Sequence, residues 1–191
     1  MSQEQHNVRH IRAPFDAAIA RSLRAGESVS ITGTILAARD AAHKRICEYL
    51  DRGEPLPVDL AGQVVYYVGP SPARPGQVIG AAGPTTAGRM DAWAPRLMAC
   101  GLLGMIGKGY RSAAVVDAMR KHGVPYLAAV GGAGALIARA IKSYTVLAWP
   151  ELGPEALAVM EVVDFPAIVV IDANGVDYYK TGQAPYRRLP A

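Results

Sequence analysis

Apolar positions along the chain change their spacing from one segment to the next. Residues 28–37 are rich in β-branched side chains and predict a strand, whereas residues 39–52 repeat apolar positions at helical spacing before Gly53, a typical helix stop. Further strands are predicted at 63–69, 78–81, 102–107, 125–130 and 144–149, and further helices at 90–98, 112–122, 131–141 and 154–160. Strands that alternate with helices in this way indicate an α/β fold with a mixed sheet.

A proline and a turn pair interrupt this pattern at two places. Pro95 interrupts one of the predicted helices, which either kinks there or begins later. Residues 165–172 and 176–180 flank the turn pair Asn174 and Gly175, and this arrangement predicts a terminal hairpin.

The beginning of the chain, MSQEQHNVRHIR, lacks the apolar core of a secretory signal and is predicted to be a solvated arm. The sequence therefore divides into an N-terminal arm (1–24), one domain (25–182) and a C-terminal tail (183–191).

Composition excludes several classes of protein. The 191 residues fit one domain, and 51% of them are hydrophobic but only 7% aromatic, so the core is expected to consist mainly of small aliphatic side chains. A formal charge of +4 is too small to indicate nucleic-acid binding, and every apolar run is shorter than the roughly 18 residues of a membrane span. The glycine-rich segment 129–140 lacks the last glycine of a dinucleotide-binding fingerprint.

Cysteine and histidine are too sparse for a metal site within the chain. Cys47 and Cys100 are too few for a four-thiolate iron–sulfur or zinc site, and the four histidines lack metal-ligand spacing. Two thiols also cannot hold together a small secreted domain, so a cytoplasmic location is expected. Both cysteines lie within helix-like patterns and are expected to serve in packing.

Cationic and hydroxyl side chains follow the ends of three predicted strands. They are Arg39 after the first strand, Thr85, Thr86 and Arg89 after the third, and Lys108 after the fourth. Ligands of open α/β sheets gather beyond the carboxyl ends of the strands, and helix amino termini favour anions. Guanidinium groups bind carboxylates through two parallel hydrogen bonds, so this set predicts a site for a small dicarboxylate.

Two neighbours of Arg39 are candidates for a supporting role. His43 comes four residues after Arg39 and shares its helical face, while Asp40 follows Arg39 directly. Each either touches the ligand or supports Arg39. The alternatives are a surface histidine and a helix-capping aspartate.

Six separated segments carry a resemblance to a known family. They are TGTILAARDAAHKR at 32–45, GPTTAGRMD at 83–91, GKG at 107–109, YLAAVGGAGALIA at 126–138, PELG at 150–153 and VDFPAIVVID at 163–172. In this order they resemble the beta subunit, or C-terminal domain, of class I iron–sulfur fumarate hydratases and the related L-tartrate dehydratases. The resemblance covers roughly residues 25–180.

The resemblance implies a swivelling β/β/α domain that closes over a substrate held on a 4Fe-4S cluster, whose open iron acts as a Lewis acid. It implies that a partner alpha subunit binds this cluster, in a hetero-oligomer with two copies of each chain. Neither nucleic acid nor a membrane is expected as a partner. Because half of the active site then lies on another chain, part of the apolar content is expected to cover an intersubunit surface.

Roles for individual residues follow from the matching motifs. The resemblance implies that Arg39 and Arg89 bind the substrate carboxylates, that Lys108 adds a cationic contact and that Thr85 stands at the proton-abstraction position. A threonine hydroxyl is a poor base at neutral pH, so a neighbouring group or an anion from the partner must assist Thr85. Thr86 is then available to cap the helix that follows.

The implied reaction is the reversible hydration of fumarate to malate. The segments GPTTAGRMD, ARDAAH, GKGYRS and EVVDFPAIVVID are more similar to the fumarate enzymes than to the tartrate enzymes. Dehydration of L-tartrate to oxaloacetate and hydration of mesaconate remain alternatives. An alternative of another class is a non-catalytic module that binds an organic anion, although such a module has no need of Thr85, Arg89 and Lys108 together.

Overall fold

The computed structural model describes residues 8–187, which form seven strands, six helices and three short 3-10 turns. The strands are β1 (Arg9–Ala13), β2 (Ser28–Ala37), β3 (Val64–Tyr66), β4 (Gly104–Gly107), β5 (Tyr126–Ala128), β6 (Ile141–Ala148) and β7 (Leu157–Ile171). The helices are α1 (Ala17–Ser22), α2 (Asp40–Arg52), α3 (Ala94–Ala99), α4 (Ala113–His122), α5 (Gly134–Ala140) and α6 (Tyr178–Thr181). The 3-10 turns are η1 (Ala87–Met90), η2 (Pro150–Glu155) and η3 (Ala184–Tyr186). Within this part of the chain, no helix combines the length and the apolar character that crossing a membrane requires.

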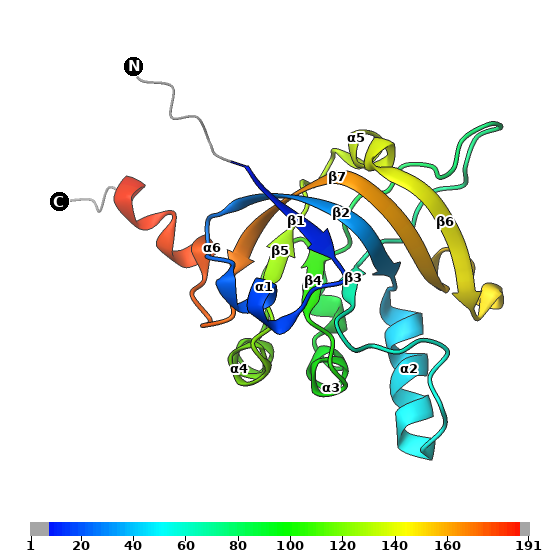
Figure 1. Ribbon diagram of the computed structural model, residues 1–191, viewed down its shortest axis with the longest axis horizontal. Helices are drawn as coiled ribbons and strands as arrows, with labels where there is room; N and C mark the ends of the chain where they lie inside the picture. The colour runs from blue at the N-terminus through cyan, green and yellow to red at the C-terminus, as the bar shows by residue number, and fades with distance from the viewer. Residues whose placement is uncertain (1–7, 188–191) are drawn as a thin grey trace.

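The strands form one mixed sheet that closes on itself (Figure 1). Its order is β1-β2-β3-β4-β5-β7-β6, and an additional pairing of β2 with β7 joins β2, β3, β4, β5 and β7 into a small barrel. Strands β1 to β5 run parallel to their neighbours, whereas β7 runs antiparallel to β2, β5 and β6. The β2–β7 ladder extends from Ser28 and Ile168 to Ala37 and Ala158, so the end of β2 lies beside the start of β7.

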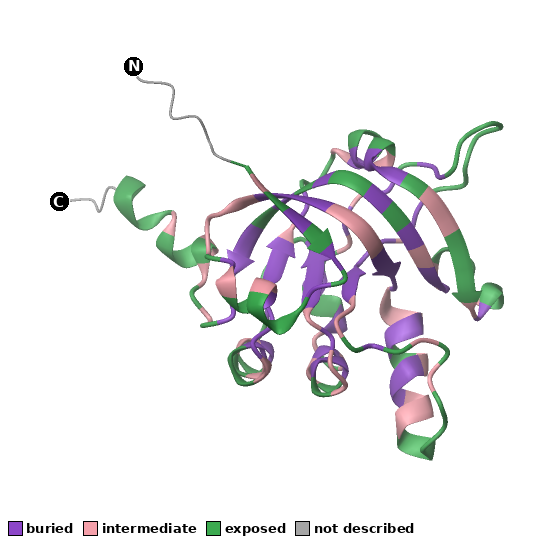
Figure 2. Ribbon diagram, viewed as in Figure 1, coloured by how far each residue is buried: buried purple, intermediate pink, exposed green. Residues whose placement is uncertain are grey.

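Alternate side chains of the strands contribute to two hydrophobic clusters (Figure 2). The first cluster fills the barrel and includes Ile35 of β2 and Met160 of β7, both fully buried. The second lies between the outer side of β3 to β5 and the helices α2, α3 and α4, and it includes Met105, Ile46 and Leu97. All three helices therefore cover one side of the barrel.

Most of the predicted strands and helices are present, and the α/β fold with a mixed sheet is confirmed. β2 has the predicted bounds, and Gly53 ends α2 with a left-handed φ of 66°, from which its N–H donates to the carbonyl of Leu50 at 3.2 Å. Pro95 lies in the first turn of α3, so this helix begins late rather than kinking.

The strand predicted at 78–81 is wrong. These residues lie in an irregular loop. Ala81 donates its N–H to Oγ of Ser71 at 2.8 Å, and its carbonyl accepts from the N–H of Ser71 at 3.1 Å. Both backbone groups of Ala81 are therefore used within the loop and do not pair with the sheet.

The helix predicted at 154–160 is wrong, and the terminal hairpin is confirmed only in part. The apolar run fits helical spacing, but from Leu157 onward it pairs with β2 on one side and β6 on the other, as part of the 15-residue strand β7. The carboxylate of Asp172 accepts the N–H groups of Asn174 and Val176 and forms the predicted turn. Ile171 and Asp177 pair across this turn as an isolated antiparallel bridge. Asp177 then caps α6 through a bond to the N–H of Tyr179, so the return strand is limited to that bridge.

The N-terminal arm is corrected for its described residues. Residues 9–13 form β1, which pairs in parallel with residues 29–33 of β2. Ile11 and Ala13 of this strand, together with Phe15, belong to the cluster that fills the barrel. The stretch predicted to be solvated is therefore part of the core, because alternate positions of an edge strand suffice to bury these side chains. Residues 1–7 and 188–191 lie outside the described residues.

Candidate functional site

The site residues predicted from sequence lie on segments that the barrel brings together. Arg39 is the N-cap residue of α2, directly beyond β2, and Asp40 begins the helix. Arg89 lies in η1, and Lys108 follows β4. Because β2, β3 and β4 are successive parallel neighbours, their carboxyl ends meet at one edge of the barrel.

Thr85 and Thr86 run alongside the end of β4. The N–H of Thr85 donates to the carbonyl of Tyr67 at 2.7 Å, and its carbonyl accepts from the N–H of Lys108 at 3.2 Å. Thr86 pairs with Lys108 as an isolated parallel bridge, and the N–H of Ala87 donates to the carbonyl of Lys108 at 2.8 Å. The backbone of Thr85 is thus fixed on both sides. Thr86 is the N-cap residue of η1, but its side chain makes no capping hydrogen bond, contrary to the role predicted for it.

Asp40 links the two arginines. Its Oδ1 accepts from Nε of Arg89 at 2.8 Å, and its Oδ2 lies 3.6 Å from Nη2 of Arg39. Arg89 remains 51% exposed, and because Nε makes the bond to Asp40, the edge formed by its two Nη atoms stays available to an external carboxylate. Asp40 therefore supports both cations and is not an isolated helix cap.

Glu155 is a site residue that sequence reasoning missed. Its Oε1 lies 3.2 Å from Nη2 of Arg39, and its Oε2 accepts from the N–H of Ala41 at 3.0 Å, in the first turn of α2. The residue falls within the segment that was predicted to be a helix, so no pattern indicated that it reaches Arg39.

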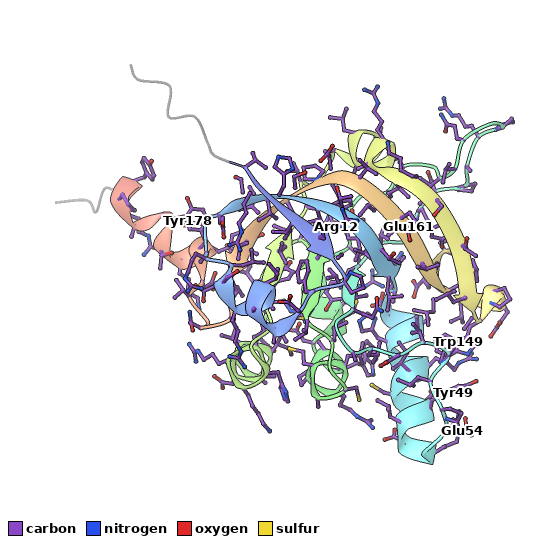
Figure 3. The ribbon with its side chains drawn as sticks, in the orientation of Figure 1. Arg12, Tyr49, Glu54, Trp149, Glu161 and Tyr178 are labelled. Carbon is purple, nitrogen blue, oxygen red and sulfur yellow. The ribbon has the colours of Figure 1, made fainter. Side chains whose placement is uncertain are left out.

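Packing of η2 against α2 explains how Glu155 reaches this position. Tyr49 of α2 contacts Trp149, which precedes η2, with ring centroids 5.5 Å apart (Figure 3). The guanidinium of Arg45 lies 5.7 Å from the same indole ring and 3.2 Å from the carboxylate of Glu151. These contacts hold the start of β7 beside the start of α2.

His43 lies beneath the site and does not face solvent. It is fully buried, its Nδ1 lies 2.8 Å from the carbonyl oxygen of Arg39, and its ring meets Tyr67 edge to face at 5.2 Å. A carbonyl only accepts, so Nδ1 carries the proton. Burial lowers the pKa of His43 from 6.5 to about 4, so the ring is neutral at pH 7. His43 is therefore placed to support Arg39 rather than to touch a ligand.

Gly69 makes room for the side chain of Arg39. A methyl group at this position would lie 2.6 Å from Nη1 and 2.9 Å from Cδ of Arg39, closer than van der Waals contact. In the sequence, this glycine is the last residue of the strand predicted at 63–69. Its structural role is to let the side chain of Arg39 lie close against the backbone at position 69.

The described residues do not offer a set of ligands for a metal ion or cluster. Among residues 8–187, no group of three or more histidine, cysteine, aspartate or glutamate side chains is arranged to hold a metal ion. Cys47 is buried, and burial raises the pKa of its thiol, which opposes the thiolate form that ligates metals. Cys100 is a free thiol that is only partly buried.

Comparison with known proteins gives one family. A family model described as "Fumarase C-terminus" matches residues 2–182. The chain is 46% identical over 156 residues to "Fumarate hydratase 2" of Leishmania major and 44% identical over 154 residues to "Fumarate hydratase class I, aerobic" of Escherichia coli. It is 36% identical over 166 residues to "Putative L(+)-tartrate dehydratase subunit beta" of Methanocaldococcus jannaschii.

The extent of these matches differs between the relatives. The alignments cover 81% and 80% of this chain but only 28% of each fumarate hydratase. The alignment with the tartrate dehydratase beta subunit covers 84% of this chain and 85% of that protein. The chain therefore spans just over a quarter of the fumarate hydratases that it matches, and most of a separate beta subunit.

Proposed function

Because the chain belongs to the fumarase C-terminus family, we propose that it is the beta-type part of an iron–sulfur hydro-lyase that reversibly hydrates fumarate to malate. The observation that carries this proposal is the meeting of Arg39, Arg89 and Lys108 around the segment that holds Thr85. Fumarate has two carboxylates, and guanidinium and ammonium groups are the side chains that bind carboxylates.

The three cations have separate tasks in this proposal. Arg39 and Arg89 bind the carboxylates and thereby orient the substrate. Lys108 is exposed, and it stabilises the negative charge that develops on one carboxylate as the adjacent carbon gains or loses its proton. Asp40 and Glu155 hold the arginines in place, so the binding geometry exists before the substrate arrives.

Thr85 is the proposed site of proton transfer. In the hydration direction its hydroxyl gives a proton to one carbon of the double bond while hydroxide adds to the other carbon. In the reverse direction it takes that proton back. The bonds from its backbone to Tyr67 and Lys108 support this role because they fix the backbone from which the hydroxyl projects. An ionisable group of the partner chain is proposed to complete the proton balance. In the dehydration direction it accepts the hydroxyl proton as Thr85 takes the proton from carbon, and in the hydration direction it returns that proton to Thr85.

The family of class I fumarate hydratases implies an iron–sulfur cluster, and we assign the 4Fe-4S cluster to a partner alpha subunit. Two observations support this assignment: the described residues offer no set of three ligands, and one relative is named as a subunit beta. A hetero-oligomer with two copies of each chain is the proposed assembly. We propose that this domain swivels to close over the substrate. The two free cysteines support a proposed cytoplasmic location.

A second candidate is the beta subunit of an L-tartrate dehydratase. The 36% identity over 166 residues to a protein so named supports it. Mesaconate hydratase is a third possibility for the same site. A non-catalytic module that binds organic anions is the alternative of another class.

Turnover by the assembled enzyme separates these candidates. The chain is co-expressed with its cluster-bearing partner under anaerobic conditions, and rates with fumarate, L-tartrate and mesaconate are compared. The proposal expects the highest kcat/KM with fumarate. Highest activity with L-tartrate supports the second candidate, and dicarboxylate binding without turnover of any of the three supports the module.

Replacement of Thr85 tests the mechanism. Thr85→Ala is expected to lower kcat by about 100-fold or more while the complex still assembles, because the proton-transfer group is lost. Thr85→Ser keeps the hydroxyl and is expected to retain most of the rate. Nearly normal turnover by the alanine variant rules out Thr85 as the proton-transfer residue.

A further inference from the structure

Arg111 is a buried cation that the proposed mechanism does not use. Its side chain is 0% exposed, although it lies only three residues after the exposed Lys108. A buried guanidinium is costly unless it is paired, so its partners indicate why it is retained.

The partners of Arg111 are one carboxylate and two aromatic rings. Nε lies 2.8 Å from Oδ1 of Asp91 in an ion pair that is close but not aligned as a hydrogen bond. Nη1 donates to the hydroxyl of Tyr67 at 3.1 Å. The guanidinium carbon lies 5.3 Å and 5.2 Å from the ring centroids of Tyr67 and Tyr126, so the cation contacts both rings.

Two of these partners are joined to segments that carry a site residue. Asp91 directly follows η1, the turn that contains Arg89, and it also accepts the N–H of Ser112 at 2.7 Å. Tyr126 donates its hydroxyl to the carbonyl of Gly109, next to Lys108, at 3.1 Å.

Tyr67 makes two further connections. Its carbonyl accepts the N–H of Thr85 at 2.7 Å, and its ring contacts His43, whose Nδ1 donates to the carbonyl of Arg39. Arg111 is therefore connected, through Asp91, Tyr126 and Tyr67, to the segments that supply Arg89, Lys108, Thr85 and, by way of His43, Arg39.

The orphaned polar atoms gather in the same place. Within residues 8–187, the buried side-chain polar atoms without a hydrogen-bond partner belong to Arg39, Asp40, His43, Asp91, Arg111 and, elsewhere in the fold, Gln63. Among them, Nε of Arg111 and Oδ1 of Asp91 form an ion pair with each other, and Oδ2 of Asp40 forms one with Arg39. Nε of Arg39, Nε2 of His43 and Nη2 of Arg111 have neither kind of partner among the described residues. Unpaired buried polar atoms are destabilising and are usually rare. Their concentration beneath the site indicates that this region is arranged for something other than stability.

We propose that Arg111 is a positioning residue for the hydration reaction, holding η1, the Thr85 segment and the Lys108 segment in register with one another. This inference rests on the proposed function of the site. A planar guanidinium suits the task because it presents donors in two directions and packs between two rings, whereas lysine has a single charged atom.

Kinetics of the assembled complex provide the first test. Arg111→Lys keeps the charge but cannot make both contacts, and it is expected to lower kcat by about 100-fold, as displacements of about 1 Å do. Tyr67→Phe keeps the ring and removes the hydroxyl, so it folds more readily and is expected to lower kcat by about tenfold. Arg52→Met is the matched control, because Arg52 is an exposed arginine paired with Glu54 on the far end of α2. Its expected kcat is that of the wild type.

A double variant separates positioning from stability. Arg111→Met combined with Asp91→Asn removes both charges, and the amide oxygen still accepts the N–H of Ser112. The reference is the single variant Arg111→Met, in which Asp91 loses its partner. If Arg111 only neutralises Asp91, the double variant regains both the Tm and the kcat that the single variant loses. Positioning by Arg111 instead predicts that Tm recovers and kcat does not. Wild-type kcat in the double variant or in Tyr67→Phe overturns the proposal.

A spectroscopic measurement keeps this test independent of turnover. In the isotope-labelled chain, the Nε–H signal of Arg89 reports its bond to Asp40. Arg111→Lys is expected to shift or broaden this signal, whereas Arg52→Met leaves it unchanged. An unchanged signal in Arg111→Lys overturns the proposal. If the wild-type complex turns over no dicarboxylate, the proposed function fails, and the Arg89 signal alone then decides whether Arg111 positions η1.

Discussion

Arg39 illustrates how much of the site depends on single contacts. Asp40 and Glu155 pair with its guanidinium, and the buried ring of His43 holds its carbonyl. Gly69 leaves the space that the side chain occupies. A surface arginine usually samples many rotamers, so these contacts convert a flexible cation into one with a defined direction.

Gly69→Ala is expected to displace Arg39 and raise KM for the dicarboxylate by roughly tenfold, because one charged hydrogen bond to substrate is lost or misaligned. Steady-state kinetics of the complex measure this change. Gly88→Ala is the matched control, since a methyl group there meets nothing closer than 3.6 Å. An unchanged KM in Gly69→Ala shows that Arg39 does not bind the substrate in this conformation.

Stability at acid pH is expected to depend on His43. Its pKa is about 4 in the folded chain and 6.5 in the unfolded chain, so between these values the unfolded state binds the extra proton. The contribution of neutral His43 to the free energy of unfolding is complete above pH 6.5, and it falls by about 3 kcal/mol as the pH drops to 4. Urea unfolding across this range measures the loss. His43→Asn keeps a donor for the carbonyl of Arg39 and does not titrate, so the same part of the pH dependence should disappear.

Individual site residues were predictable to different degrees. Four of them follow predicted strand ends: Arg39, Thr85, Arg89 and Lys108. They were predictable because the carboxyl ends of parallel strands lie at the same edge of a sheet. Arg111 offered no signal, because an arginine in a polar segment is normally exposed. Its burial requires Asp91 and two tyrosines from other elements, and such a coincidence is visible only in three dimensions.

At the level of elements, β2 and α2 were predictable and β7 was not. The hydrophobic pattern of β2 fits a strand, the pattern of α2 fits the 3.6-residue repeat of a helix, and Gly53 marks the end of that helix. The first half of β7 fits the hydrophobic repeat of a helix as well as that of a strand, and its pairing with β2 and β6 makes it a strand. β1 was missed because only alternate residues of its five are apolar, and a pattern so short has little weight without its partner strand.

Neighbouring residues of β1 provide a matched test of its place in the core. Ile11 is buried in the barrel, whereas Arg12 points to the opposite, exposed face (Figure 3). Ile11→Ala is expected to lower the free energy of unfolding by about 2–4 kcal/mol, and Arg12→Ala to change it by less than about 0.5 kcal/mol. Equal effects in urea unfolding contradict the assignment of β1 to the core.

On the scale of the whole molecule, exposed apolar side chains lie close to the site. Tyr110, Val130 and Leu136 are 65%, 60% and 62% exposed, and we call them the apolar rim. Tyr110 lies two residues after Lys108, and Val130 precedes Gly131, where an added methyl group would lie 3.6 Å from the Lys108 side chain. A partner that completes the site would cover this rim, as exposed apolar groups of this size favour burial in an interface.

The combined substitutions Val130→Glu and Leu136→Glu are expected to weaken binding of the cluster-bearing partner by about tenfold or more, because charge replaces apolar contact. Analytical ultracentrifugation or calorimetry measures the change in Kd, and the Tm of the separate chain should stay constant. Val176→Glu, at an exposed valine in the turn between β7 and α6, is the control. Equal affinity of the double variant and the control would place the partner on another face.

Closure of the barrel by β2 and β7 also determines how the site can move. Arg39 follows β2, Lys108 follows β4 and Glu155 precedes β7, so each belongs to a segment joined directly to the closed ring. A closed ring of hydrogen-bonded strands resists shear between its members. Any motion that brings this domain toward a partner must therefore be rigid, with its hinge outside the ring. If Arg39 and Lys108 bind carboxylates as proposed, they then arrive at the substrate together, in one step and with their spacing already set.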